Sequence, residues 1–530
     1  MTSNQPSQPP RPPLVRLPGE ISRLIYSHPS NRDIKNLRLV SSFFDRTAPL
    51  RLDRVFISAD PRNLEVFEAV SQHDVYRAQI TEVVWDDALL ASSLLEHDPS
   101  AINNVITDEI DDRSERDPCP KWYSKACEEN IQIWRSMLLR SWRKSRSLAR
   151  EPQFVTTLMS LKDSWAYYQG LLRQQQEVLD TRAHVRALES GISRFPALRK
   201  ITITGVAHGR LFTPVYETPM IRAFPNGFNY AIPSWPAYQP ECPVWTESGR
   251  RWEGFRVVMN LLAQNLDGGK VTELNIKSFQ LRTGLNCRFF EKPCQTLTNL
   301  EMVLGRASFE SLHLDLMVHH DDFQAHVFDH NLLKRVLAGT ARGQGLKKLA
   351  LGASVAPWGF YVPLETIYGP NNLRRLEHFN LSRLLVKEKD LLALLARMPL
   401  SIRTIELSFL DFLEGNYQSL LSQIKDTLGW QNRDPRPLMS IGADTQLDDH
   451  GVAIWAENEV YSFLYEGGVN PFDHDSMLYR DLCLGDGLGI VKDALDPENR
   501  WPNLSHQDLE EIGYVRNLLC DDSFAQRLQY

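Results

Sequence analysis

The sequence predicts an α/β protein in which a small helical module precedes a long, irregular array of strand-and-helix units. Two observations predict this fold. Short segments of the form Φ-x-x-Φ-x-Φ, where Φ is apolar, recur along the chain with helical patterns between several of them, and alternation along a strand turns their apolar residues to one face. Residues 14–56 carry two short amphipathic helical patterns that cannot bury a core alone. With 530 residues the chain is long enough for two or three domains or for one extended array.

The N-terminal module opens with Pro18, whose fixed φ suits the first turn of a helix. Apolar residues then follow at helical spacing, namely Ile21, Leu24 and Ile25. Pro29 ends this helix, and either Asn31 or Asp33 caps a second one. The second helix is expected to hold its apolar residues on one stripe: Ile34, Leu37, Val40 and Phe44.

The order of residues in the module resembles an F-box, and the chain is similar to fungal-type F-box proteins. The motifs that carry the resemblance are Leu17-Pro18-x-Glu20-Ile21 and Leu37-Arg38-Leu39-Val40-Ser41, followed by Phe44. The resemblance implies docking on a Skp-type adaptor of a cullin–RING ubiquitin ligase. The residues that it assigns to this contact and to the packing of the helices are Leu17, Pro18, Ile21, Ile25, Ile34, Leu37, Val40 and Phe44. The alternative is a helical cap on a larger domain.

The remaining elements divide the chain into consecutive regions. The expected regions are a disordered tail (1–13), the F-box (14–54), a first β/α unit (55–90), a helical insertion (91–195), a leucine-rich-repeat-like solenoid (196–430) and an acidic C-terminal cap (431–530).

The first β/α unit pairs strands at 55–58 and 80–85 with a helix capped by Asp60 and Pro61. In the insertion, residues 122–146 look helical, and a second helical pattern begins at Pro152. Its apolar residues form a heptad-like seam: Phe154, Leu158, Leu161, Trp165, Tyr168 and Leu172. This seam packs either inside the chain or against a partner helix.

The strand patterns beyond the insertion look like a leucine-rich repeat array, in which each unit buries its apolar face by stacking on its neighbours. They lie at 198–203, 271–276, 297–302, 309–314, 346–351, 373–378 and 402–407. Helical patterns at 391–398 and 417–428 lie among them. The segment 212–252 is an insertion whose aromatic residues either bind a substrate or pack on the array: Trp235, Tyr238, Trp245 and Trp252.

Charge and composition exclude several classes of protein. Residues 441–530 hold 18 acidic and 5 basic side chains, so a chain of net charge −7 carries −13 there and +6 elsewhere. This imbalance indicates either a solvated surface or a face that steers a basic partner. There is no concentrated basic stripe for nucleic acid, no apolar run of the roughly 18 residues that a membrane helix needs, and no apolar signal core. The seven cysteines fit free thiols in an intracellular protein of the cytoplasm or nucleus.

The strongest candidate for metal chemistry is a histidine- and aspartate-rich segment comprising His319, His320, Asp321, Asp322, His326 and His330. It is either a zinc or iron site or a polar helix on the outside of a repeat, and the second interpretation is preferred. Glycine-rich phosphate loops, nucleophile elbows and paired zinc-binding cysteines do not occur in the sequence. We therefore expect no metal, no cofactor and no active site.

The predicted function is that of a substrate-recognition subunit, which binds a Skp-type adaptor through the F-box and an unknown protein substrate through the array. The alternative is a protein-interaction scaffold that recruits no ligase. A third possibility is a metal-dependent enzyme that uses the segment 319–330.

Overall fold

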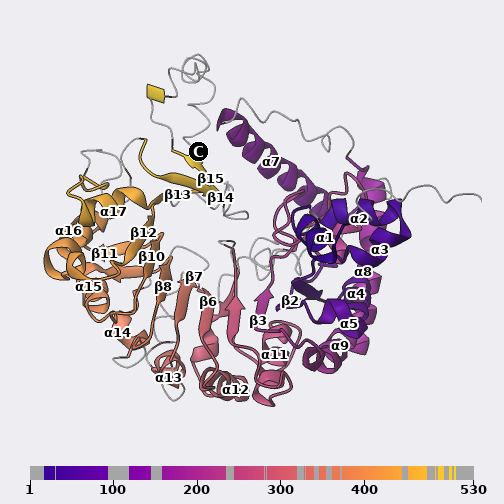
Figure 1. The fold of residues 1–530 in the computed structure, drawn as a ribbon, viewed down its shortest axis with the longest axis horizontal. Helices are drawn as coiled ribbons and strands as arrows, with labels where there is room; N and C mark the ends of the chain where they lie inside the picture. Colours follow the sequence, from indigo (N-terminus) through magenta and orange to yellow (C-terminus); the bar gives the residue numbers. More distant parts are fainter. Residues whose placement is uncertain are drawn as a thin grey trace, which may run out of the picture.

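The protein, studied as a computed structural model, is organised around one large and mostly parallel β-sheet (Figure 1). The structure describes residues 17–93 (except 30), 119–144, 158–233, 244–318 (except 280 and 282), 328–339 (except 329), 345–353, 361–369, 373–443, 452–473, 487–493, 500–503 and a few further positions. Within these residues the sheet has 13 strands.

Nine strands follow one another in parallel through the sheet, in chain order. They are β1 (Arg54–Ile57), β2 (Glu82–Asp86), β3 (Lys200–Thr204), β4 (Glu273–Ile276), β6 (Ser311–Met317), β7 (Lys348–Ala353), β8 (His378–Ser382), β10 (Thr404–Ser408) and β12 (Leu438–Gly442). The short β5 (Leu285–Asn286) pairs with the end of β6. A separate two-stranded ladder joins β9 (Leu385–Lys387) to β11 (Asp411–Glu414).

At the C-terminal end of the sheet, each strand runs antiparallel to the one before it. The three strands are β13 (Val452–Ala456), β14 (Ile490–Asp493) and β15 (Arg500–Pro502).

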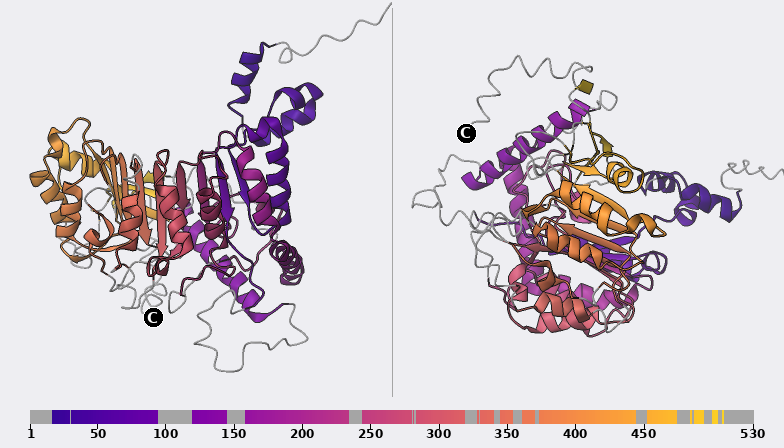
Figure 2. Two further views of the ribbon diagram at one scale, coloured as in Figure 1. Left: turned by 90° about the horizontal axis from the view of Figure 1, so that it is seen from below. Right: turned by 90° about the vertical axis from the view of Figure 1, so that its left-hand side faces the viewer.

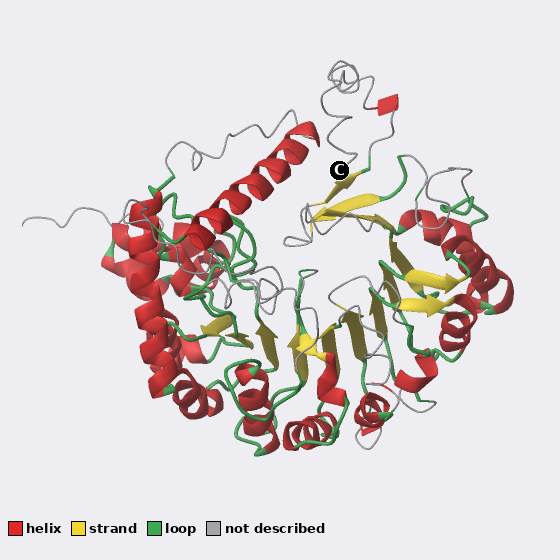
Figure 3. Cartoon of the chain, turned by 180° about the vertical axis from the view of Figure 1, so that it is seen from behind, coloured by secondary structure: helices red, strands yellow, loops and turns green. Residues whose placement is uncertain are grey.

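Helices cover the outer side of the curved sheet, and the opposite side, which we call the inner face, is concave (Figures 1 and 3). The helices along the outer side are α11 (Glu253–Ala263), α12 (Gln295–Leu304), α13 (Leu332–Gly339), α14 (Leu364–Ile367), α15 (Glu388–Ala396) and α16 (Tyr417–Thr427), with α17 (Asn458–Tyr465) packed on α16. Among the described helices, none combines the length and the apolar composition that a transmembrane helix requires.

The remaining helices gather at the N-terminal end of the sheet. They are α1 (Gly19–Tyr26), α2 (Asn31–Val40), α3 (Ser42–Thr47), α4 (Pro61–Gln72), α5 (Asp74–Arg77), α7 (Lys121–Lys144), α8 (Leu161–Thr181), α9 (Ala183–Gly191) and α10 (Pro219–Arg222). Short 3-10 turns occur at η4 (Ile192–Arg194), η5 (Cys287–Phe290) and η8 (Trp430–Asn432).

The core lies between the sheet and the outer helices. One apolar side chain from each of seven neighbouring strands stands directly opposite the next, and all seven are buried: Ile201, Leu274, Leu312, Leu349, Phe379, Ile405 and Met439. Each buried side chain of this kind contributes about 1.5–3 kcal/mol relative to exposure. Neighbouring strands of the sheet therefore pair side by side with the same apolar position facing the core.

Most elements predicted from the sequence are confirmed. The strand patterns at 55–58, 80–85, 198–203, 271–276, 309–314, 346–351 and 402–407 all coincide with strands. Asp60 caps α4 through its side chain, which accepts hydrogen bonds from the backbone N–H groups of Arg62 and Asn63. The helical patterns at 122–146, 391–398 and 417–428 correspond to α7, α15 and α16.

Two strand predictions are wrong. Residues 297–302 lie in α12, because Leu297, Leu300 and Leu304 fall on one helical face and are buried there. The pattern at 373–378 is displaced by three residues, since the strand is β8 and its buried residues are Phe379 and Leu381. The apolar position that comes three residues before Phe379 is therefore Leu376, and Leu373 lies outside the pattern.

The seam in the insertion is partly confirmed. Residue 152 lies outside the described residues, and the described helix α8 begins at Leu161 after an N-cap at Ser160. Trp165 and Tyr168 are buried against Tyr123 of α7, with ring centroids 4.8 and 5.0 Å away. Leu158 and Leu161 are exposed. The central part of the seam thus packs inside the chain.

Candidate functional site

The helices α1, α2 and α3 form a module that stands away from the end of the sheet (Figure 2). It has a small core of its own, composed of Tyr26, Ile34, Phe44 and Ala48 with the half-buried Leu37, Phe43 and Leu50. The rings of Tyr26 and Phe44 meet edge to face with centroids 6.5 Å apart. Three very short helices are therefore held together by a few aromatic and aliphatic contacts.

The second helical stripe expected from the sequence is wrong in its last part. Helix α2 ends at Val40, and Ser41 takes an extended conformation in which its hydroxyl accepts a hydrogen bond from the Phe43 N–H at 3.1 Å. Serine is a preferred N-cap because its side chain satisfies a free backbone donor. Phe44 consequently reaches the core from α3, whereas Val40 is 75% exposed.

Five large apolar side chains of the module face solvent, and we call them the apolar surface: Ile21, Leu24, Ile25, Leu39 and Val40. The first three lie on one face of α1 because they are three and four positions apart. Leu39 is 87% exposed and Leu24 is 60% exposed. Exposed apolar side chains gathered on one helix face, as on α1, are a usual mark of a binding site.

The eight residues assigned by the F-box resemblance divide into two groups. Ile34 and Phe44 are buried and Leu37 is half-buried, so these three hold the module together. Ile21, Ile25, Val40 and Pro18 are exposed, and Leu17 is half-buried. Pro18 lies just before α1, and its carbonyl accepts the first helical hydrogen bond, from Ser22 N–H at 3.0 Å.

Sequence reasoning omitted Leu24 and Leu39 from this set, although both are among the most exposed apolar residues of the module. The helical spacing from Ile21 was the available signal for Leu24.

The turn between α1 and α2 is tied down by Asn31 and Arg51. The Asn31 amide donates to the Arg51 carbonyl at 2.8 Å and accepts from the Arg51 N–H at 2.9 Å. The Arg51 guanidinium also donates to the carbonyls of Ser27 and Pro29. Either Asn31 or Asp33 was expected to cap α2; the Asn31 side chain bonds to the backbone of Arg51 and so links the start of α2 to the segment that follows α3.

Arg38 joins the module to the body of the protein. Its guanidinium donates to Asp45 of α3 at 2.7 and 2.9 Å and to the Tyr76 hydroxyl of α5 at 3.0 Å. A second link is the hydrogen bond from the Leu52 N–H to the Gln79 side chain at 3.3 Å. Arg38 therefore links α2 to α3 and, through Tyr76, to α5.

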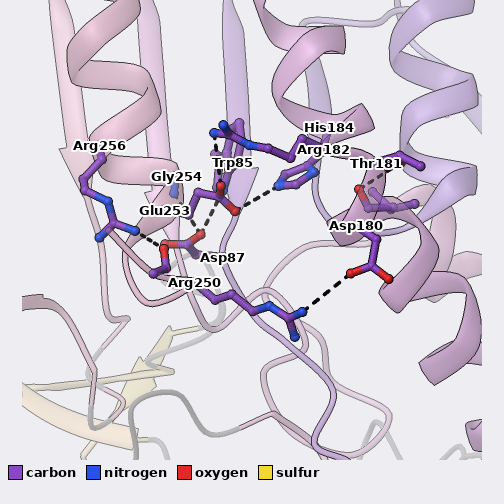
Figure 4. A network of polar contacts seen from close by, with 12 residues as sticks. Trp85, Asp87, Asp180, Thr181, Arg182, His184, Arg250, Glu253, Gly254 and Arg256 are labelled. Atoms are coloured by element: carbon purple, nitrogen blue, oxygen red, sulfur yellow. Dashed lines mark hydrogen bonds and ion pairs between the residues drawn. The ribbon is translucent and has the colours of Figure 1, made fainter. Parts of the chain in front are cut away.

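A second polar site lies at the carboxyl end of β2 (Figure 4). Asp87 accepts hydrogen bonds from Trp85 Nε1 at 3.0 Å and from the Gly254 N–H at 3.1 Å. Nearby, Glu253 faces Arg182 at 3.4 Å and His184 at 3.3 Å. Burial raises the pKa of Asp87 to about 6. These contacts join β2 to the N-terminus of α11 and to the junction of α8 and α9.

The neighbouring Asp86 points to the other side of the strand. Its carboxylate accepts a hydrogen bond from the Ala88 N–H at 3.1 Å and lies 4.0 Å from His208, which is bonded to the Tyr230 hydroxyl at 2.7 Å. Burial raises the pKa of Asp86 to about 8 and lowers the pKa of His208 to about 4. Both groups are therefore uncharged at neutral pH, and the hydrogen bond between His208 and Tyr230 ties the loop after β3 to the segment that contains Tyr230.

A polar cavity of about 410 Å³ opens between the N-terminal ends of α11 and α12. Its charged groups are already engaged: Glu247 accepts from the Thr296 N–H at 3.2 Å and hydroxyl at 2.8 Å, and Arg256 donates to backbone carbonyls of residues 246–251. The charged groups around this cavity therefore hold the neighbouring loop in place, and this arrangement does not favour a catalytic site.

The other sequence-predicted sites give mixed outcomes. Residues 319–327 lie outside the described residues, so the proposed metal segment is not tested, and the part of the chain that is described contains no group of side chains suited to a metal ion. Trp235 and Tyr238 also lie outside it. Trp252 is buried, and Trp245 packs on Phe289 with centroids 4.7 Å apart, so both pack on the sheet structure.

In comparisons with known proteins, no protein-family model and no curated protein matches this sequence.

Proposed function

We propose that residues 14–54 are an F-box that docks on a Skp-type adaptor, and that the curved sheet is a leucine-rich-repeat-like array that binds a protein substrate. The protein would then be a substrate-recognition subunit of a cullin–RING ubiquitin ligase without an active site of its own. The observation that carries the proposal is the apolar surface of the N-terminal module. It lies within the segment whose motifs resemble an F-box.

The geometry supports this role in two ways. The apolar surface lies on a module that projects from the end of the sheet, where a partner can approach it without meeting the outer helices (Figure 2). Helix α1 contributes only Tyr26 to the apolar core of the module, and three of its apolar side chains face solvent. The exposed face of α1 is thus available as a docking element.

The test is adaptor binding by an Ile21→Asp variant of the full chain. Ile21 is 44% exposed in the first turn of α1, where an acidic residue favours the helix dipole, so the module should still fold. Loss of an interface anchor costs about 2 kcal/mol or more, which is roughly thirtyfold in affinity. We expect co-purification of a Skp-type adaptor to be lost in this variant.

The matched control is Val66→Asp, because Val66 is 41% exposed on α4, outside the module. This variant should bind adaptor like the wild type. Wild-type protein that does not bind adaptor at micromolar concentration would reject the F-box and leave a scaffold that recruits no ligase.

A further inference from the structure

The amino ends of the last parallel strands carry a concentration of arginine. The three loops that lead into β8, β10 and β12, at 373–377, 397–403 and 428–437, hold two acidic residues, Glu377 and Asp434, and six basic ones. We call the six basic residues the arginine rim: Arg374, Arg375, Arg397, Arg403, Arg433 and Arg436. Five of them are exposed and Arg433 is half-buried. These loops thus carry a net charge of +4 in a chain of net charge −7.

The three loops lie side by side, because β10 pairs with β8 on one side and with β12 on the other. Two arginines also tie each loop to the one before it. Arg397 donates to the Gly369 carbonyl, ahead of β8, at 2.7 Å, and Arg433 donates to the Pro399 carbonyl at 3.3 Å. A carbonyl is an uncharged acceptor, so these hydrogen bonds position the guanidinium groups without neutralising them. The arginine rim is therefore one continuous positive surface.

Arg403 lies at the centre of the rim, directly before β10, and Lys348 begins β7 on the same edge. Both side chains are exposed, and neither forms a hydrogen bond or an ion pair with another described residue. His378 of β8 lies between them. Burial lowers the pKa of His378, the charges of Lys348 and Arg403 lower it further, and Glu377 acts in the opposite direction. The two cations thus act on one point of the edge, and both are available to an anionic partner.

Two exposed leucines accompany the arginines. Leu400 is 79% exposed in the loop before β10, and Leu438 is 54% exposed at the start of β12. Leu438 lies beside Arg403, because its N–H donates to the Arg403 carbonyl at 2.8 Å. Trp430, the aromatic residue of the three loops, is buried. A guanidinium binds carboxylates in pairs of hydrogen bonds, and an exposed leucine contacts apolar side chains. This combination favours an acidic protein segment over a nucleic-acid strand, whose bases need exposed aromatic rings for stacking.

We propose that the arginine rim binds an acidic segment of a partner protein. Aspartate or glutamate side chains of that segment pair with Arg403 and its neighbours, and an apolar residue contacts Leu400 and Leu438. This inference rests on the part of the proposed function in which the array binds a protein substrate, and it names the chemistry of that substrate. From Lys348 to Leu438 the edge covers three strand spacings, about 14 Å, which an extended segment of about four or five residues spans.

The test measures fluorescence anisotropy of the full chain with a labelled peptide about eight residues long, in which glutamates surround a central leucine. We expect Arg403→Glu to weaken binding about tenfold or more, because it replaces an attractive charge with a repulsive one at the centre of the rim. Leu400→Ser should weaken binding by a smaller factor, because it removes an apolar contact and leaves the charges in place. Both positions are exposed, so circular dichroism should match the wild type.

The matched control is Arg173→Glu, which makes the same change of charge at an exposed position of α8 and should leave the affinity unchanged. Binding that survives Arg403→Glu would come from another surface and would overturn the proposal. Absence of binding by the wild type at about millimolar peptide would overturn it as well. So would equal binding of a peptide with lysine in place of glutamate, or tighter binding of a single-stranded oligonucleotide of the same length. The assay contains no adaptor, so its failure is separate from a failure of the F-box assignment.

Discussion

Asp86 and Asp87 show how neighbouring residues obtain different chemistry from the two sides of one strand. Asp87 is directed toward α11 and is stabilised by the Trp85 and Gly254 N–H groups. Asp86 is directed toward His208 and Tyr230 and has one backbone donor. The fewer donors that a buried carboxylate has, the more its charged form is disfavoured. The pKa of Asp86 is accordingly raised further than that of Asp87.

This difference predicts a pH dependence of stability. Between its unfolded pKa near 3.8 and its folded pKa of about 8, Asp86 holds a proton only in the folded state. The free energy of unfolding therefore falls as pH rises through this window, by at most about 1.4 kcal/mol per pH unit. His208, with its pKa lowered to about 4, acts in the opposite direction below pH 6.5. The loss should thus be visible between pH 6.5 and 8.

Asp86→Asn should remove that loss, because the amide keeps the acceptor for the Ala88 N–H and cannot ionise. The measurement is urea-induced unfolding of both proteins at pH 6.5 and at pH 8. The wild type should lose stability between these values and the variant should not. An identical decline in both proteins would show that Asp86 is already ionised in the folded state.

At the scale of elements, the Asn31 side chain ties the start of α2 to the segment that follows α3. The two hydrogen bonds between Asn31 and the backbone of Arg51 close a loop of the chain that includes α2 and α3. Hydrogen bonds of this kind contribute about 0.5–1.5 kcal/mol each. The start of α2 is therefore held by a partner 20 positions away in the sequence.

Asn31→Ala should destabilise the module by about 1–3 kcal/mol, since both hydrogen bonds are lost. Asn31→Asp is the matched control, because it keeps the acceptor for the Arg51 N–H and loses only the donor. Hydrogen exchange of residues 19–50 measures the effect and should rank wild type, aspartate and alanine in order of decreasing protection. Equal protection in the alanine variant and the wild type would show that the turn is held by other contacts.

The whole molecule contains separate hydrophobic cores. The module core around Ile34 and Phe44 is distinct from the large core between the sheet and the outer helices. Arg38 and Leu52 provide polar links between the module and the sheet body. We therefore expect the module to unfold locally while the sheet stays folded.

Ile34→Ala tests this independence, because Ile34 is fully buried in the module core. Truncation of a buried isoleucine costs about 2–5 kcal/mol. Hydrogen exchange should accelerate in residues 19–50 and stay unchanged in β3 and β4. Leu39→Ala, at a position 87% exposed, should change neither region. Faster exchange throughout the sheet in Ile34→Ala would mean that the two cores unfold together.

The sequence by itself determined the elements whose signals are local. Alternating apolar residues in segments such as 346–351 and 402–407 are sufficient to specify strands, and Asp60 before Pro61 is sufficient to begin a helix. The same local reasoning misassigned Leu297–Met302, because apolar residues three apart fit one face of a helix as well as a strand. Only packing between the sheet and the neighbouring helices decides between the two.

The candidate site divides in the same way. The motif order around Leu17 and Leu37 predicts which segment would bind a partner, a prediction that stays open, and helical spacing indicated the exposed face of α1. Which residues lie inside the module was decided by tertiary structure, since Ser41 breaks the helix and sends Val40 outward and Phe44 inward. The lateral alignment of side chains on the inner face was also beyond the sequence, because residues as far apart as Asn275 and Ser440 come from different strands and only the register of the sheet places them in one row.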